Sequence, residues 1–102
     1  MNDFESNRTA SGLTEFSGVL DKKNVNHIWQ QRQGLLENDT PHVIDLAKIT
    51  RCDSAGLALL VCLKKEAEQS GLGLTFTNIP QHLQQLIGLS HLDDILNRQQ
   101  SL

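Results

Sequence analysis

The longest apolar stretch of the chain combines a strand-like segment with a helix-like segment. The first, Val43–Ala47, is apolar except for one acidic residue, which is typical of a central strand in a sheet covered on at least one face. After a short polar turn, Asp53 and Ser54 are residue types that cap helices, and we expect a helix over Ser54–Ser70. Because residues 55–63 contain no polar side chain, this helix must be covered on all sides or contact a partner.

Alternation of apolar and polar residues predicts the remaining strands. Two short strands, Phe4–Arg8 and Leu13–Phe16, are separated by a turn over Thr9–Gly12. Another strand is predicted at Leu74–Thr77, and Gly71 before it fits the left-handed position that ends many helices. A strand, a crossover helix and a second strand of this spacing form a βαβ unit with parallel strands.

A 3.6-residue period predicts two more helices. The first, of about twelve residues, is capped near Asp21–Asn24 and is ended by turn-forming residues at 38–41. The second begins at Pro80 with Gly88 near its end. The stripe of the first helix comprises Val25, Ile28, Trp29, Arg32, Leu35 and Leu36; after Gly88, helical spacing continues through Leu89, Leu92, Ile95 and Leu96.

These elements predict an α/β fold with a central mixed, partly parallel β-sheet packed with about four helices. The βαβ crossover runs through the Ser54–Ser70 helix. The chain of 102 residues is long enough for one hydrophobic core and too short for two, so we expect a single domain over residues 1–102.

Charge and composition exclude several classes of function. The net charge is −3 and the nine Lys and Arg residues are scattered, which does not predict a nucleic-acid surface. No apolar run reaches the roughly 20 residues of a membrane-spanning helix, and the first residues, Met1–Ser6, do not resemble a secretory signal. We therefore expect a cytoplasmic protein with no direct membrane insertion.

The residues that bind metals in other proteins are not grouped in this sequence. Cys52 and Cys62 lie ten positions apart, a spacing that fits neither a disulfide framework nor a zinc site. The four histidines fall on different predicted elements and form no metal-binding pair in sequence. The sequence predicts no metal site and no cofactor.

Asp53 and Ser54 have two interpretations that are compatible with each other. Either residue fits a helix N-cap, where a side-chain oxygen accepts a hydrogen bond from a free backbone amide. A hydroxyl just beyond the carboxyl end of a central parallel strand also stands where α/β sheets place their ligands and contacts.

The apolar helix divides into two arcs. One can face the sheet and comprises Leu57, Leu60, Val61 and Lys64, with Leu63 and Ala67 adjoining. The other arc consists of apolar and mostly small residues for two turns and then becomes charged. It comprises Ala55, Ala58, Leu59, Cys62 and Glu66. Contact with another protein and burial under the chain's own third helix both explain this second arc.

The same residues carry a family resemblance. Residues 43–46 followed by 49–60 resemble the signature of STAS domains, the fold shared by anti-sigma-factor antagonists and the cytoplasmic tails of sulfate transporters. The segment Ser17–Asp21 and the helix that contains Trp29 match the same pattern, so the resemblance covers almost the whole chain. Within the family, the chain is most similar to the stand-alone STAS subunit of the bacterial Mla phospholipid ABC transporter.

One position separates the subfamilies. In the sigma-regulating members, the serine or threonine that the partner kinase phosphorylates stands immediately before the glycine, and this chain has Ala55 there. Ser54, one residue earlier, corresponds to the hydroxyl residue that the transporter subunit keeps at the contact with its ATPase. Ser54 is therefore a candidate regulatory hydroxyl, because a phosphate there would add charge and bulk to a protein contact.

The resemblance implies a non-catalytic cytoplasmic subunit, peripheral to the inner membrane through its partner. It would bind an ABC transporter ATPase, and indirectly the inner-membrane permease complex, and would support assembly and activity in phospholipid trafficking between the inner and outer membranes. The residues expected to contact the partner are Arg51, Cys52, Asp53, Ser54, Ala55, Ala58, Leu59 and Cys62.

Two alternatives remain open from the sequence. The first is a kinase-controlled anti-sigma-factor antagonist, against which Ala55 weighs. The second is a small hydrolase or ligand-binding domain that uses Ser54 together with His42 or His91. This second alternative requires a histidine within hydrogen-bond reach of Ser54 in an accessible pocket.

Overall fold

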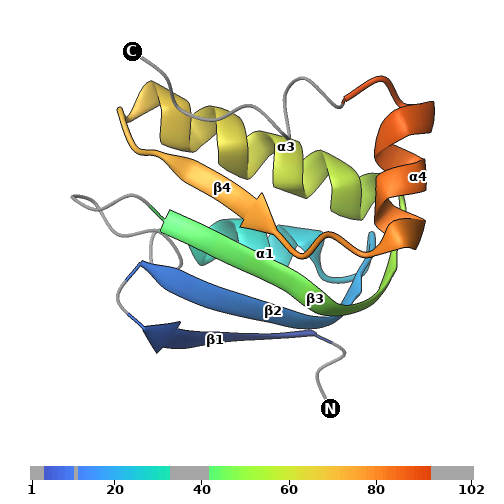
Figure 1. Cartoon of the computed structure of the whole chain (residues 1–102), viewed down its shortest axis with the longest axis horizontal. Coiled ribbons are helices and arrows are strands. Elements are labelled where there is room, and N and C mark those ends of the chain that lie inside the picture. Colours follow the sequence, from blue (N-terminus) through green and yellow to red (C-terminus); the bar gives the residue numbers. More distant parts are fainter. Residues whose placement is uncertain (1–3, 11, 33–41, 93–102) are drawn as a thin grey trace.

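A four-stranded sheet forms the centre of the computed structural model, which describes residues 4–10, 12–32 and 42–92 (Figure 1). Its strands lie in the order β1 (Phe4–Ala10), β2 (Leu13–Leu20), β3 (His42–Cys52) and β4 (Leu74–Thr77). The β1–β2 pair is antiparallel, whereas β2–β3 and β3–β4 are parallel. The predicted mixed sheet, with parallel pairing around its central strand, is confirmed.

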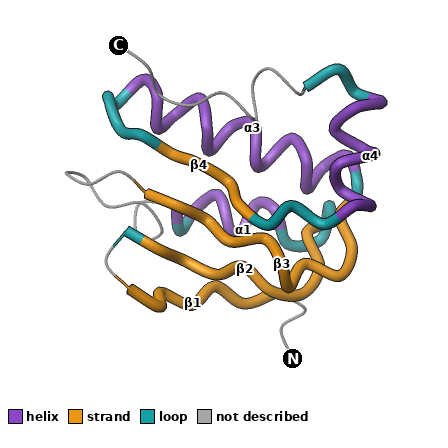
Figure 2. Tube along the Cα trace, in the orientation of Figure 1, coloured by secondary structure: helices purple, strands orange, loops and turns teal. Residues whose placement is uncertain are grey.

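The described helices are α1 (Val25–Gln30), α3 (Ser54–Gln69) and α4 (Gln81–Leu89). Figure 2 shows α1 and α3 on one face of the sheet and α4 at the end of the sheet where β3 stops. The crossover from β3 to the parallel strand β4 runs through α3, as predicted. Within the described ranges, no helix is both long enough and apolar enough to cross a membrane.

Two predicted helical segments differ from the structure or extend beyond it. The first helix ends at Gln30, with Gln31 as its C-cap, and is half as long as predicted. Leu35 and Leu36 lie outside the described residues. The helical spacing predicted after Gly88 is interrupted, because α4 ends at Leu89 and His91 adopts a left-handed φ of 57°. Ile95 and Leu96 also lie outside the described residues.

The hydrophobic core lies between the sheet and the two helices on one face. Alternate residues of the strands point into it, and the sheet-facing arc predicted for α3 is buried there except for Val61, which is partly buried. Lys64 on this arc is completely buried, and its ammonium donates to the carbonyl oxygen of Leu74 on β4. The principal core residues are Phe16, Leu20, Ile44, Leu46, Ile49, Leu57, Leu60, Leu63, Leu74 and Leu83.

Strand β3 is longer than predicted. Two bulges interrupt its alternation of apolar and polar residues, so the pattern does not reveal its second half. Relative to β2, one extra residue occurs between Asp45 and Lys48 and another between Ile49 and Arg51. Each extra residue reverses the side on which the following side chains lie. The segment that looked like a polar turn in the sequence is therefore the second half of the strand, which continues to Cys52.

Local interactions at both ends fix the length of α3. At its start, the Asp53 carboxylate accepts a hydrogen bond from the Gly56 amide. At its end, Gly71 has a φ of 76°, its amide donates to the Glu68 carbonyl, and the Leu72 amide donates to the Ala67 carbonyl at 2.8 Å. This pair of bonds with a left-handed glycine is the Schellman motif, which confirms the role expected of Gly71.

Candidate functional site

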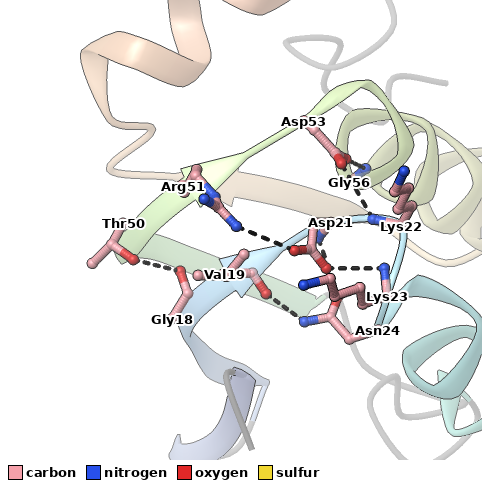
Figure 3. A network of polar contacts seen from close by, with 10 residues as sticks. All are labelled: Gly18, Val19, Asp21, Lys22, Lys23, Asn24, Thr50, Arg51, Asp53 and Gly56. Carbon is pink, nitrogen blue, oxygen red and sulfur yellow. Dashed lines mark hydrogen bonds and ion pairs between the residues drawn. The ribbon is translucent and has the colours of Figure 1, made fainter.

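The Asp53 side chain joins the N-terminus of α3 to the turn that follows β2 (Figure 3). One carboxylate oxygen accepts from the Gly56 amide at 2.9 Å, and the other accepts from the Lys22 amide at 3.2 Å. These backbone hydrogen bonds, principally that from Gly56, hold the pKa of Asp53 below its usual range because they stabilise the charged form. Asp53 is therefore the N-cap of α3 and also links it to β2.

Asp21 holds the same turn from its other side (Figure 3). Its carboxylate accepts from the Lys23 amide at 3.0 Å and forms an ion pair of 3.4 Å with Arg51 at the end of β3. Asn24 completes the turn, because its side-chain amide donates to the Val19 carbonyl at 2.7 Å. The Arg51 side chain is 70% exposed, so it is oriented by Asp21 and remains open to contact.

Ser54 is exposed at the first position of α3. Within the part of the chain that the structure describes, its hydroxyl has no hydrogen-bond partner. The capping role that the sequence left open between Asp53 and Ser54 belongs to Asp53. The Ser54 hydroxyl is consequently available to a ligand or partner.

An apolar groove lies between α1 and α3. Its volume is about 320 Å³, and we call it the α1–α3 groove. The lining residues are Val25, Asn26, Trp29, Ala55, Ala58, Leu59 and Cys62. The second arc of α3 is thus bordered by α1 and not by α4, the third helix of the sequence prediction.

Leu59 differs from the prediction for this arc. Only 5% of its surface is exposed, and it belongs to the core cluster. The reason is helical spacing, because Leu59 lies one turn from both Gly56 and Leu63, which are buried. The exposed stripe of the helix is instead Ser54, Ala58, Cys62, Lys65 and Gln69.

A second groove of about 390 Å³ lies between the end of β3 and α4. Arg51 and Cys52 line this α4 groove, so the predicted contact residues are divided between two hollows on either side of Asp53 and Ser54. Burial, and secondarily the nearby Asp53 carboxylate, raise the pKa of the Cys52 thiol to about 11. The full lining is Thr50, Arg51, Cys52, His82, Gln85, Leu86 and Leu89.

Several groove residues were not predicted as contacts. Val25 and Trp29 were read from their spacing as core residues of the first helix, and they do pack partly against the core. Their additional exposure to the α1–α3 groove depends on how α1 lies beside α3, which periodicity along one helix does not reveal. Leu89 of α4, which the sequence placed only at helical spacing, is 81% exposed and also lines the α4 groove.

The hydrolase alternative paired Ser54 with His42 or His91, and the described part of the chain contains no hydrogen bond between Ser54 and either histidine. His42 is buried at the start of β3, and its Nε2 lies 2.8 Å from the Thr14 hydroxyl oxygen. The length of β3 places it roughly 30 Å from Ser54 at about 3.3 Å per residue. His91 follows the end of α4, and Ser54 is hydrogen-bonded to neither histidine within the described ranges.

Comparisons with known proteins agree with this architecture. The family model described as "Mlab, STAS domain" matches residues 6–97. The "Intermembrane phospholipid transport system binding protein MlaB" of Escherichia coli K12 is 32% identical over 83 residues, which cover 80% of this chain and 84% of that protein. The protein of the same name from Shigella flexneri matches to the same extent.

A solved structure shows the same fold. The anti-sigma factor antagonist SpoIIAA in its unphosphorylated form superposes with a TM-score of 0.69 at 17% identity, covering 90% of this chain and 84% of that one. The family match and the curated relatives go further than this likeness of fold. The chain belongs to the STAS-domain family and is MlaB-like within it.

Proposed function

We propose that this chain is a non-catalytic cytoplasmic subunit that binds the ATPase of an ABC transporter. In this role it supports the assembly and activity of a transporter that moves phospholipid between the inner and outer membranes. It would reach the inner membrane and the permease complex only through the ATPase. The relatives in Escherichia coli and Shigella flexneri are named as intermembrane phospholipid transport system binding proteins, which supports this proposal.

The observation that carries the proposal is the α1–α3 groove beside the N-terminus of α3. Ala58 and Cys62 are exposed there, Ala55 is half-buried, and the lining is predominantly apolar. Small exposed side chains let a partner approach the helix backbone closely, and apolar walls accept an apolar side chain. The Ser54 hydroxyl at one end supplies a polar contact that can orient the partner.

Asp53 and Ser54 are the polar residues at the start of α3, whereas Arg51 lines the neighbouring α4 groove. Asp53 is engaged in capping α3, so its contribution to binding is to hold the helix start in place. ATP hydrolysis belongs to the partner in this proposal. The chain can change the activity of the ATPase only by binding its conformations with unequal affinity.

A pair of charge substitutions tests the docking surface. Ala58→Glu places a carboxylate in the α1–α3 groove, and Gln69→Glu adds the same charge on the same exposed stripe, about 16 Å further along α3 at 1.5 Å per residue. We expect the purified ATPase to be captured by the Gln69→Glu variant and not by the Ala58→Glu variant, both having native circular dichroism. Equal capture by both variants would contradict the proposal.

Signalling as an anti-sigma-factor antagonist is the second candidate, and the exposed Ser54 hydroxyl is the observation that favours it. Against it, the residue immediately before Gly56 is Ala55. A pull-down from the native cell with the purified chain as bait distinguishes the two functions. The transporter role predicts recovery of an ABC ATPase, whereas the antagonist role predicts recovery of a histidine-kinase-like anti-sigma factor.

A further inference from the structure

Trp29 forms one wall of the α1–α3 groove, and the guanidinium of Arg32 lies over its ring. The Arg32 guanidinium carbon lies 4.1 Å from the centroid of the indole ring. One guanidinium nitrogen of Arg32 also donates to the Trp29 carbonyl oxygen at 2.9 Å. Arg32 itself is not among the residues that line the groove.

Arg32 is attached to α3 as well. Its Nε donates to a carboxylate oxygen of Glu66, and the two side chains are 26% and 35% exposed. A guanidinium is planar and offers several donors, so one side chain can stack on an aromatic ring and still bind a carboxylate in its plane. Trp29, Arg32 and Glu66 therefore form a chain of contacts from α1 to α3.

We infer that Arg32 is a positioning residue for partner binding, because it fixes the Trp29 ring as a wall of the α1–α3 groove. This inference rests on the proposed docking role of that groove. A large ring on a short helix has two side-chain torsions that must be ordered before a partner can pack against it. Arg32 orders them in the free protein, and such preorganisation lowers the cost of binding. Glu66 contributes by holding the guanidinium over the ring.

The free protein offers a direct readout, because Trp29 is the only tryptophan of the chain. Its fluorescence anisotropy and its quenching by acrylamide report the mobility and accessibility of the groove wall. We expect Arg32→Ala to lower the anisotropy and to increase the quenching constant. Arg32→Lys keeps the positive charge but loses the planar fork, and Glu66→Gln removes the anchor on α3, so both should give intermediate values.

Partner binding is measured on the same variants. Titration with the purified ATPase should show a dissociation constant about 3- to 10-fold weaker for Arg32→Ala, corresponding to the loss of one cation–π contact and of its ordering effect. Lys65→Ala removes a charge from an exposed position of α3 outside the groove lining and should leave both readouts unchanged. Circular dichroism verifies that each variant is folded.

The outcomes separate this inference from the proposed function. Unchanged anisotropy and quenching in Arg32→Ala would overturn the positioning role, whatever the binding result. A looser ring with unchanged affinity would also overturn it, provided that Ala58→Glu abolishes capture. If Ala58→Glu still captures the ATPase, the docking surface itself is wrong, and the role of Arg32 in partner binding is rejected with it. A looser ring and weaker binding, with intermediate values for Arg32→Lys, support the inference.

Discussion

Gly56 in the first turn of α3 packs directly against the carbonyl group of Leu20 at the end of β2. A β-carbon on Gly56 would overlap the Leu20 carbonyl oxygen and would stand 2.8 Å from the sulfur of Cys52. The same carbonyl accepts a hydrogen bond from the Asp53 amide at 3.1 Å. Helix α3 thus starts in direct contact with the neighbouring strand, and the absence of a side chain at Gly56 allows this approach.

The first prediction concerns this contact. Gly56→Ala should destabilise the protein by about 1 to 3 kcal/mol, because the new methyl group meets backbone that must move. Gly88→Ala is the control, since a β-carbon there has no described atom within 4 Å and the residue lies inside α4. That substitution should stabilise by about 0.5 to 1 kcal/mol through helix propensity. Urea unfolding measures both, and equal midpoints would disprove the close packing of Gly56.

The cap of α3 should make stability depend on pH. Because the pKa of Asp53 is lowered in the folded protein from its ordinary value of 3.8, its stabilisation is complete above that value and is lost as the pH falls through the folded pKa. Asp53→Asn keeps a capping oxygen but does not titrate. The stability advantage of the native protein over Asp53→Asn should therefore shrink between about pH 7 and about pH 2.5, measured by urea unfolding.

Removing the cap oxygen tests the same residue in a different way. Asp53→Ala should cost about 0.5 to 2 kcal/mol at neutral pH. Ser54→Ala should change stability by less than about 0.5 kcal/mol, because the described structure gives its hydroxyl no hydrogen-bond partner. A larger loss of stability in Ser54→Ala than in Asp53→Ala would show that Ser54, and not Asp53, is the cap.

Ser54→Ala also tests partner contact, because its small expected effect on stability leaves any change in binding attributable to the lost hydroxyl. If the hydroxyl contacts the ATPase, this variant should keep its unfolding midpoint and lose capture. A phosphate-like charge from Ser54→Asp should be accommodated at the helix N-terminus and should likewise prevent capture. Full capture by Ser54→Ala would remove this residue from the proposed docking surface.

The two cysteines should differ in reactivity. Cys62 is exposed in the α1–α3 groove, whereas Cys52 is half-buried and its pKa is raised to about 11, so little of its thiol is ionised at neutral pH. Iodoacetamide at about pH 8 should modify Cys62 first, and should modify Cys52 much more slowly until the protein unfolds. Peptide mass spectrometry locates the label. A bulky maleimide on Cys62 should block ATPase capture, and unimpaired capture by the labelled protein would place the contact elsewhere.

Periodicity predicted the elements that are regular. The strand Leu74–Thr77 and the start of α3 at Ser54 were located correctly, because alternation and capping chemistry act within a few residues. The second half of β3 was missed because two bulges break the period of two there. Such an extra residue depends on the partner strand, so no local pattern in β3 indicates it.

The candidate site was predicted less completely than the fold. The arc that contains Ala58, Leu59 and Cys62, for which partner contact and burial were both open, is divided: Ala58 and Cys62 are exposed, and Leu59 belongs to the core. The wall formed by Trp29 arises from contact between two helices that are far apart in sequence. Contacts of that kind depend on tertiary packing and are not encoded in the spacing of either helix alone.

Because of the two bulges, the way in which the last residues of β3 face the start of α3 depends on how many residues the strand contains. Each bulge inverts the inside and outside positions, so that Ile49 is buried and Cys52 reaches the start of α3. Exposed side chains of this segment, such as those of Ala47 and Lys48, could be exchanged without altering this arrangement. Deleting a single residue there, with the preceding register kept, would instead bring Asp53 into the place of Cys52 and would displace the N-cap of α3. In this segment, the number of residues therefore determines which side chains meet the start of α3.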